Sequence, residues 1–179
     1  MTLTSEVVIP TRLEAREQLF KACSMMNDLG VVHDVDPEAG IDWVGYFEEA
    51  QKKLVLSGSG QRSGTIVLTD WYPLDRTLEL DSHVEIKGAY RAKHHLGSSC
   101  GFRAEGGFVG DWVLCWKKPK ERDNYSNFGS GIRNVHIESR NGVGGVYFRG
   151  AQQSAGVENC TQECGVRIGT GRNALGPAP

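Results

Sequence analysis

The stretch that decides the fold reads Ile132-Arg133-Asn134-Val135-His136-Ile137-Glu138-Ser139. It recurs in similar form as Val157-Glu158-Asn159-Cys160-Thr161-Gln162-Glu163-Cys164, with both the Asn and the Glu displaced by 25 residues (134 to 159 and 138 to 163). A period in the twenties that holds strands and turns but no helix is typical of a β-solenoid, in which each coil buries its apolar side chains by stacking on a neighbour. The two Asn residues would then occupy equivalent corners, where Asn tolerates a left-handed backbone. A β-sandwich with two similar strands is the alternative.

Short β runs continue outward from this repeat through most of the chain. Apolar and alternating segments separated by Gly, Asn, Asp and Ser predict strands at 65–69, 74–80, 84–86, 100–103, 113–116, 132–137, 146–148 and 166–168. The 23 glycines follow no collagen-like period, which favours a turn-rich β architecture. We therefore expect an all-β fold, a right-handed parallel β-helix of few coils.

Two helices are predicted before the strands begin. Residues 11–29 open with the capping box Thr11-Arg12-Leu13-Glu14 and end at Gly30. The second helix begins after Asp42, a good N-cap, and carries an apolar stripe made by Trp43, Phe47, Ala50 and Leu54. The expected organisation is a helical cap over residues 1–62, β-helix coils over 63–170 and a Gly/Pro-rich tail over 171–179.

Composition excludes several classes of protein. With 20 Lys+Arg against 22 Asp+Glu in 179 residues, the formal net charge of −2 argues against a general nucleic-acid binder. No apolar stretch approaches the roughly 20 residues that span a bilayer, and the opening lacks the basic and apolar regions of a secretory signal. The five cysteines, at 23, 100, 115, 160 and 164, include no C-x-x-C pair, so we expect buried free thiols and synthesis in a reducing, cytoplasmic compartment.

Three segments, Gly64–Leu74, Thr77–Leu80 and His83–Gly88, together hold a Gly-led strand, a Tyr-containing turn and a strand closed by Gly. Together they resemble the N-terminal part of the pectate-lyase-like right-handed parallel β-helix superfamily. Further along, Gly131–Ile137, Gly145–Ser154 and Val157–Asn159 are similar to a coil of laminarin-type exo-β-glucanases, so that about residues 41–170 are covered. The resemblance implies N-terminal capping helices, stacked coils and a polysaccharide partner.

The sequence departs from the family's pattern in two ways, so the likeness in fold does not by itself imply the family's activity. Gly40-Ile41-Asp42-Trp43 stands where the family has Gly-Asp-Gly and Thr-Asp-Asp-Thr, and only a few coils are present, which predicts a truncated β-helix. No catalytic residue of the family maps onto this chain. The functional prediction is the N-terminal portion of a carbohydrate-active protein, a polysaccharide lyase or glycoside hydrolase. The alternative is a non-catalytic structural or receptor-binding protein, such as part of a virion-associated phage tailspike.

The repeat supplies one candidate catalytic pair, Glu138 and Glu163. Coils in register place the two one above the other, about 4.8 Å apart along the stack. Retaining glycosidases hold their two carboxyl groups about 5–5.5 Å apart. Repulsion between two carboxylates that close raises the pKa of one of them, which prepares an acid beside a base. The alternative is a solvated pair neutralised by Arg133, Arg140 or Arg167.

Other residues suggest sugar platforms or metal ligands. Trp112, Trp116 and Tyr125 are candidate platforms for the apolar face of a sugar, with filling of the core as the alternative. His33, Asp34 and Asp36 lack the remaining calcium-loop ligands, and adjacent His94 and His95 on a strand point to opposite faces. The glycine pairs lack the strand–loop–helix context of a nucleotide site. We expect neither a metal nor a cofactor.

The C-terminal end of the predicted solenoid has no cap. The tail after Ile168 is rich in Gly and Pro and holds no amphipathic helix. An uncapped last coil exposes unpaired backbone groups and apolar interior to water. We therefore expect self-association through this end of the chain.

Overall fold

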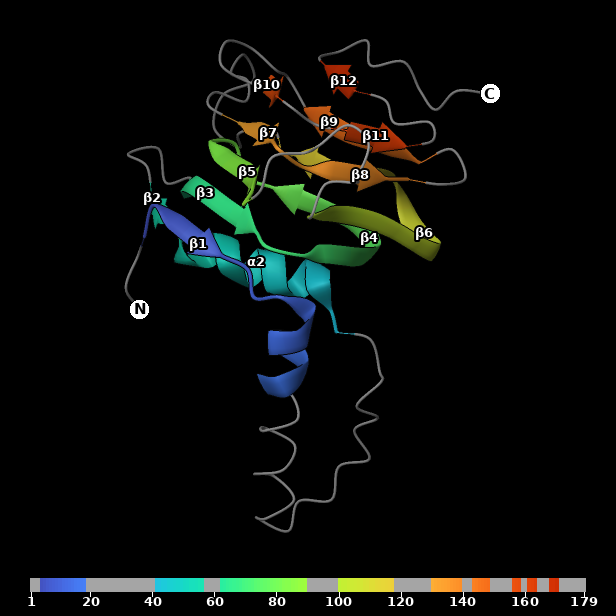
Figure 1. Cartoon of the computed structure of the whole chain (residues 1–179). Coiled ribbons are helices and arrows are strands. Elements are labelled where there is room, and N and C mark those ends of the chain that lie inside the picture. The colour runs from blue at the N-terminus through green and yellow to red at the C-terminus, as the bar shows by residue number, and fades with distance from the viewer. Residues whose placement is uncertain are drawn as a thin grey trace.

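Parallel strands make up most of the described residues in the structure, a computed structural model (Figure 1). It describes residues 4–18, 41–56, 62–89, 100–117, 130–139 and 143–148, and the strand backbone of residues 156–158, 161–163 and 168–170. The expected all-β class with N-terminal helix is confirmed. No helix within these ranges is long and apolar enough to cross a membrane.

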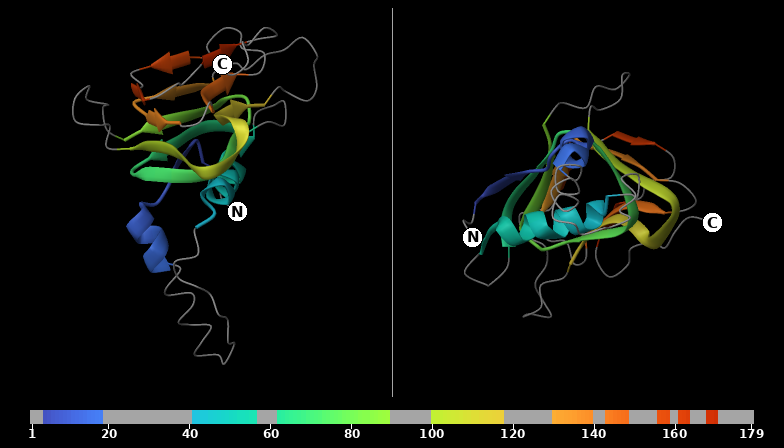
Figure 2. Two further views of the ribbon diagram at one scale, coloured as in Figure 1. Left: turned by 90° about the vertical axis from the view of Figure 1, so that its right-hand side faces the viewer. Right: turned by 90° about the horizontal axis from the view of Figure 1, so that it is seen from below.

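The strands stack in three parallel ladders, which Figure 2 shows from below as the sides of a triangle. The first ladder is formed in order by β1 (Glu6–Val8), β3 (Arg62–Leu68), β5 (Val84–Gly88), β7 (Gly131–Arg133) and β10 (Gly156–Glu158). The second is formed by the first parts of β4 (Trp71–Leu80) and β6 (Gly101–Trp116), then β8 (His136–Glu138) and β11 (Thr161–Glu163). The third is formed by the last parts of β4 and β6, then β9 (Gly144–Phe148) and β12 (Ile168–Thr170).

The interior is filled by apolar side chains that share a register position in successive strands. The rows are Ile66, Ile86 and Ile132 on the first ladder, Tyr72, Phe102 and Ile137 on the second, and Leu80, Trp116 and Phe148 on the third. All nine side chains are at most 2% exposed. The rings of Trp116 and Phe148 stack with their centroids 4.5 Å apart, and the Trp116 indole donates to the carbonyl of Val84 at 2.7 Å. Alignment of large side chains between coils therefore builds the core.

One helix, α2 (Trp43–Lys53), covers the N-terminal end of this interior, below β4 in Figure 1. The predicted stripe of Trp43, Phe47, Ala50 and Leu54 is buried, each side chain at most 4% exposed. Phe47 packs edge-on against Tyr72 and tilted against Phe102, so the helix closes the end of the stack with aromatic contacts.

The start of α2 is held by the predicted N-cap. The Asp42 carboxylate accepts from the backbone N–H of Gly45 at 2.9 Å and pairs with the Arg76 guanidinium at 3.0 Å. These two contacts, the hydrogen bond first, hold the pKa of Asp42 below its ordinary value. The cap therefore also connects α2 to β4.

Corners separate the ladders, and one of them confirms the role expected of Asn134. This residue has φ +56° and lies between β7 and β8, so the run 132–137 forms two strands rather than the single one predicted. Asn159, its expected equivalent, lies outside the described residues. The free thiols Cys100 and Cys115 are buried as expected.

Two features differ from the sequence-based expectation, and a third, the first helix, agrees with it as far as the described residues reach. The segment 1–62, expected to be helical, also contributes β1 and the short β2 (Val55–Leu56), which pairs antiparallel with the start of β3. Residues 12–18 are helical, and the rest of the predicted helix 11–29 lies outside the described residues. The runs 100–103 and 113–116 belong to one long strand, β6.

Candidate functional site

The two predicted site residues lie on adjacent strands of the second ladder. Glu138 is on β8 and Glu163 is on β11, and their Cα atoms are register partners. The repeat of 25 residues therefore does place the two positions one above the other. Only the backbone of β11 is described, so the distance between the carboxylates stays a prediction.

Glu138 already has a cationic partner, which the sequence did not identify. Its carboxylate accepts from Nε of Arg103 at 2.6 Å, and Arg103 is its register partner on β6. The Glu138 side chain is 12% exposed and that of Arg103 is 52% exposed. Of the partners expected for this carboxylate, Arg133 instead pairs with Glu85 on the first ladder, while Arg140 and Arg167 lie outside the described residues.

A tryptophan and a histidine adjoin this ion pair. Trp71 on β4 and His136 on β8 are both register partners of Gly101, which lies between them on β6. Because Gly101 has no side chain, the two rings approach to 5.0 Å between centroids. The Arg103 guanidinium lies 5.6 Å from the centre of the Trp71 ring, a cation–π distance. We call Trp71, Arg103, His136 and Glu138 the ladder cluster.

A hollow of about 700 Å³ adjoins the ladder cluster where β6 departs from the register of β4. Arg103 lines it and so belongs to both features. The remaining lining residues are Ala104, Glu105, Gly106, Gly107, Phe108, Gly110 and Val143. Ligand pockets typically have volumes of about 300–1,000 Å³, so the hollow is large enough for a small ligand.

The aromatic residues proposed as sugar platforms divide between core and surface. Trp116 is fully buried in the interior, so its role is the alternative that the sequence left open, filling of the core. Trp112 is half-buried, and its ring stacks on that of Tyr147 at 5.1 Å above Gly144. Tyr125 lies outside the described residues. Trp112 thus remains a candidate platform.

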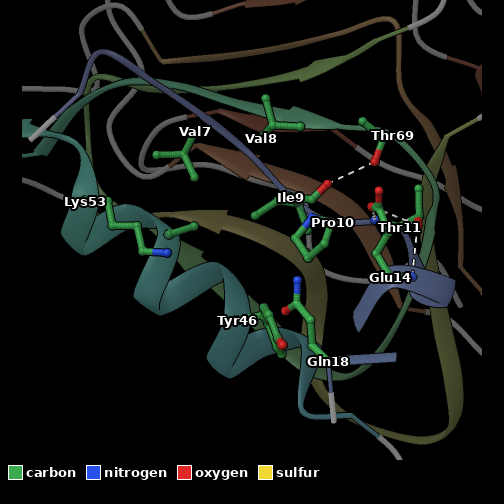
Figure 3. Close-up of a pocket in the computed structure, with 11 residues that line it drawn as sticks. Val7, Val8, Ile9, Pro10, Thr11, Glu14, Gln18, Tyr46, Lys53 and Thr69 are labelled. Carbon is green, nitrogen blue, oxygen red and sulfur yellow. Dashed lines mark hydrogen bonds between the residues drawn. The ribbon is translucent and has the colours of Figure 1, made fainter. Parts of the chain in front are cut away.

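A second cavity, of about 540 Å³, lies between β1, residues 9–18 and α2 (Figure 3). Glu14 and Thr11 form the predicted capping box on its rim, and Thr69 donates to the carbonyl of Ile9 at 2.9 Å. Its lining holds Lys53 and Tyr46 but no cluster of converging charges. The hydrogen bond from Thr69 holds the N-terminal segment against the coils, and Thr11 and Glu14 bond to each other at the start of the helix, so these side chains have a structural role (Figure 3).

The residues weighed as metal ligands in the sequence, His33, Asp34, Asp36, His94 and His95, all lie outside the described residues. Among the described ranges, no group of three His, Cys, Asp or Glu side chains is placed to hold a metal ion.

Sequence reasoning found Glu138 but missed Arg103, Trp71, His136 and the hollow. Arg103 and Trp71 lie 35 and 67 positions before Glu138 (138 − 103 and 138 − 71), and no local pattern joins them to it. His136 lies two positions before Glu138 on the same strand, so the alternation of side chains along a strand could have indicated it. Trp71 and Arg103 could have been identified by aligning the strands that contain them, β4 and β6, in register with the first copy of the repeat, which contains β8.

Comparison with known proteins does not assign the chain to a family. No family model, curated protein or solved structure matches the chain.

Proposed function

We propose that this chain is a right-handed parallel β-helix that binds polysaccharide on the outer surface of its second ladder. Three parallel ladders and the left-handed corner at Asn134 support the β-helix. Parallel crossovers are right-handed in about 98% of cases, which supports the hand. The resemblance to pectate-lyase-like proteins supports a polysaccharide partner.

The observation that carries the binding proposal is the hollow beside the ladder cluster. Arg103 lines this pocket-sized space, and the same side chain lies over the half-buried Trp71 ring and donates to the carboxylate of Glu138. Sugars need both, since one face of the ring is apolar and the hydroxyl groups require hydrogen-bonding partners.

The test is a binding screen of the full chain against β-glucan, pectin and alginate. We expect at least one polysaccharide to bind, and Trp71→Ala to weaken that binding. Tyr46→Ala is the matched control, because Tyr46 is an exposed aromatic on α2 that does not line the hollow. Absence of binding to every polysaccharide, or equal loss in both variants, would contradict the proposal.

Cleavage by Glu138 and Glu163 is the second candidate function, favoured by their register pairing on β8 and β11. The polysaccharide found to bind is incubated with the chain, and reducing ends and unsaturated products are measured. Glu163→Gln is expected to abolish turnover and retain binding. Binding without turnover in the unaltered chain would instead favour the non-catalytic, receptor-binding alternative.

A further inference from the structure

The hollow has a distinct wall, built where β6 bulges away from β4. Register between the two strands shifts on both sides of the pair formed by Arg76 and Val109. The bulging part carries Gly106, Gly107 and Gly110, of which the last two have positive φ. A Cβ on Gly106 or Gly107 would meet nothing within 4 Å, so the backbone here is open to a ligand.

Phe108 supplies the apolar surface of this wall. It lines the hollow while packing partly against the core, and Val143 from the start of the next coil lies beside the same space. A ring that is fixed on one side by the core and open on the other is suited to stack against the apolar face of a sugar.

The charges around the hollow do not suit an anionic ligand. Among the described residues that line it, Arg103 is the only cation, and its ion pair with Glu138 neutralises it. Glu105 lines the hollow and is exposed, and exposed Asp111 follows directly after the wall. A uronate carboxylate placed here would meet like charge, with no unpaired cation in the described part of the lining to compensate, which disfavours binding.

We propose that this hollow binds a neutral oligosaccharide, with Phe108 as the platform and with Arg103 and Glu105 bonding to its hydroxyl groups. The inference rests on the proposed polysaccharide-binding function and narrows it to uncharged glycans. It also makes Glu105 the residue that determines specificity against acidic sugars.

The experiment is calorimetric titration of the full chain with a neutral β-glucan oligosaccharide and with an oligogalacturonate of equal length. We expect the neutral ligand to bind and the acidic one not to bind. Phe108→Leu, which keeps apolar volume but removes the ring, should weaken neutral binding by about three- to tenfold. Val109→Ala is the matched control, because Val109 is 70% exposed and does not line the hollow.

A gain-of-function variant separates specificity from folding. Glu105→Lys alters an exposed side chain and should allow the oligogalacturonate to bind. Binding of oligogalacturonate by the unaltered chain, or unchanged neutral binding in Phe108→Leu, would overturn the inference while leaving polysaccharide binding intact. Failure of both ligands together with every polysaccharide of the wider screen would overturn the proposed function as well.

Discussion

Single glycines decide how closely the side chains of successive coils approach. Gly101 lies between Trp71 and His136 on the second ladder, and a Cβ there would come within 2.2 Å of the carbonyl oxygen of His136. The position of Gly88 on the first ladder leaves equally little space, because a Cβ there would lie 2.0 Å from the carbonyl oxygen of Asn134. The absence of a side chain at these positions brings one coil against the next.

The substitution Gly101→Ala tests this close approach. We expect it to lower the free energy of unfolding by about 1–3 kcal/mol, because the backbone of β8 must move away to admit the methyl group. Urea unfolding measures the change. Gly106→Ala is the control, since open space surrounds that position and little loss is expected. Equal effects of the two substitutions would contradict the argument.

At the scale of the element, α2 depends on its cap as well as on its buried face. The stripe that begins at Trp43 packs onto β4, while Asp42 bonds to the first turn and to Arg76. The side chain of Asp42 is 58% exposed, so its ion pair contributes little and the hydrogen bond to Gly45 carries most of the effect.

Asp42→Ala should therefore destabilise the protein by about 1 kcal/mol at neutral pH, the usual cost of losing an N-cap. The pKa of Asp42 is lowered in the folded state, so its ionised form stabilises the fold. That contribution is complete above about pH 4, the ordinary pKa of an aspartate, and is lost as pH falls through the lower folded-state pKa. Urea unfolding of both proteins from pH 7 downward measures the difference.

The control for the cap is Asp75→Ala. Asp75 pairs with the same Arg76 but is 69% exposed and caps no helix, so we expect a change within about 0.5 kcal/mol. A difference between Asp42→Ala and the unaltered protein that stays constant down to acidic pH would contradict the assignment of the cap.

At the scale of the whole molecule, stability depends on each coil having neighbours. Strands β3, β5 and β7 each pair with a strand on both sides of the first ladder. By contrast, β10, β11 and β12 each pair with one strand among those the structure describes, namely β7, β8 and β9. In stacked-coil proteins the interface with a neighbour supplies much of the stability of a coil.

Amide hydrogen exchange should therefore be slower in β5 than in β10, β11 and β12 at low protein concentration. If copies of the chain associate through this end of the stack, as the lack of a predicted cap leads us to expect, protection of the three end strands rises with concentration. Mass spectrometry of exchanged peptides measures both effects. Equal protection of β5 and the end strands at high dilution would refute the expected difference.

Local patterns in the sequence determined the class of structure and part of its register. The 25-residue repeat predicted that Glu138 and Glu163 align, and the stripe from Trp43 to Leu54 predicted a buried helix face behind the cap at Asp42. The helix face and its cap follow from residues a few positions apart, and the alignment follows from the recurrence of one motif along the chain.

Only the tertiary structure decided which residues meet across coils. Arg103 rather than Arg133 pairs with Glu138, Trp71 reaches His136 past Gly101, and β6 runs unbroken to form the hollow. The three-residue strand β1 likewise exists because β3 offers it a parallel partner. The physical reason is that coils are joined by segments of unequal length, so the register between distant strands is set by interior packing and backbone pairing, which no local pattern encodes.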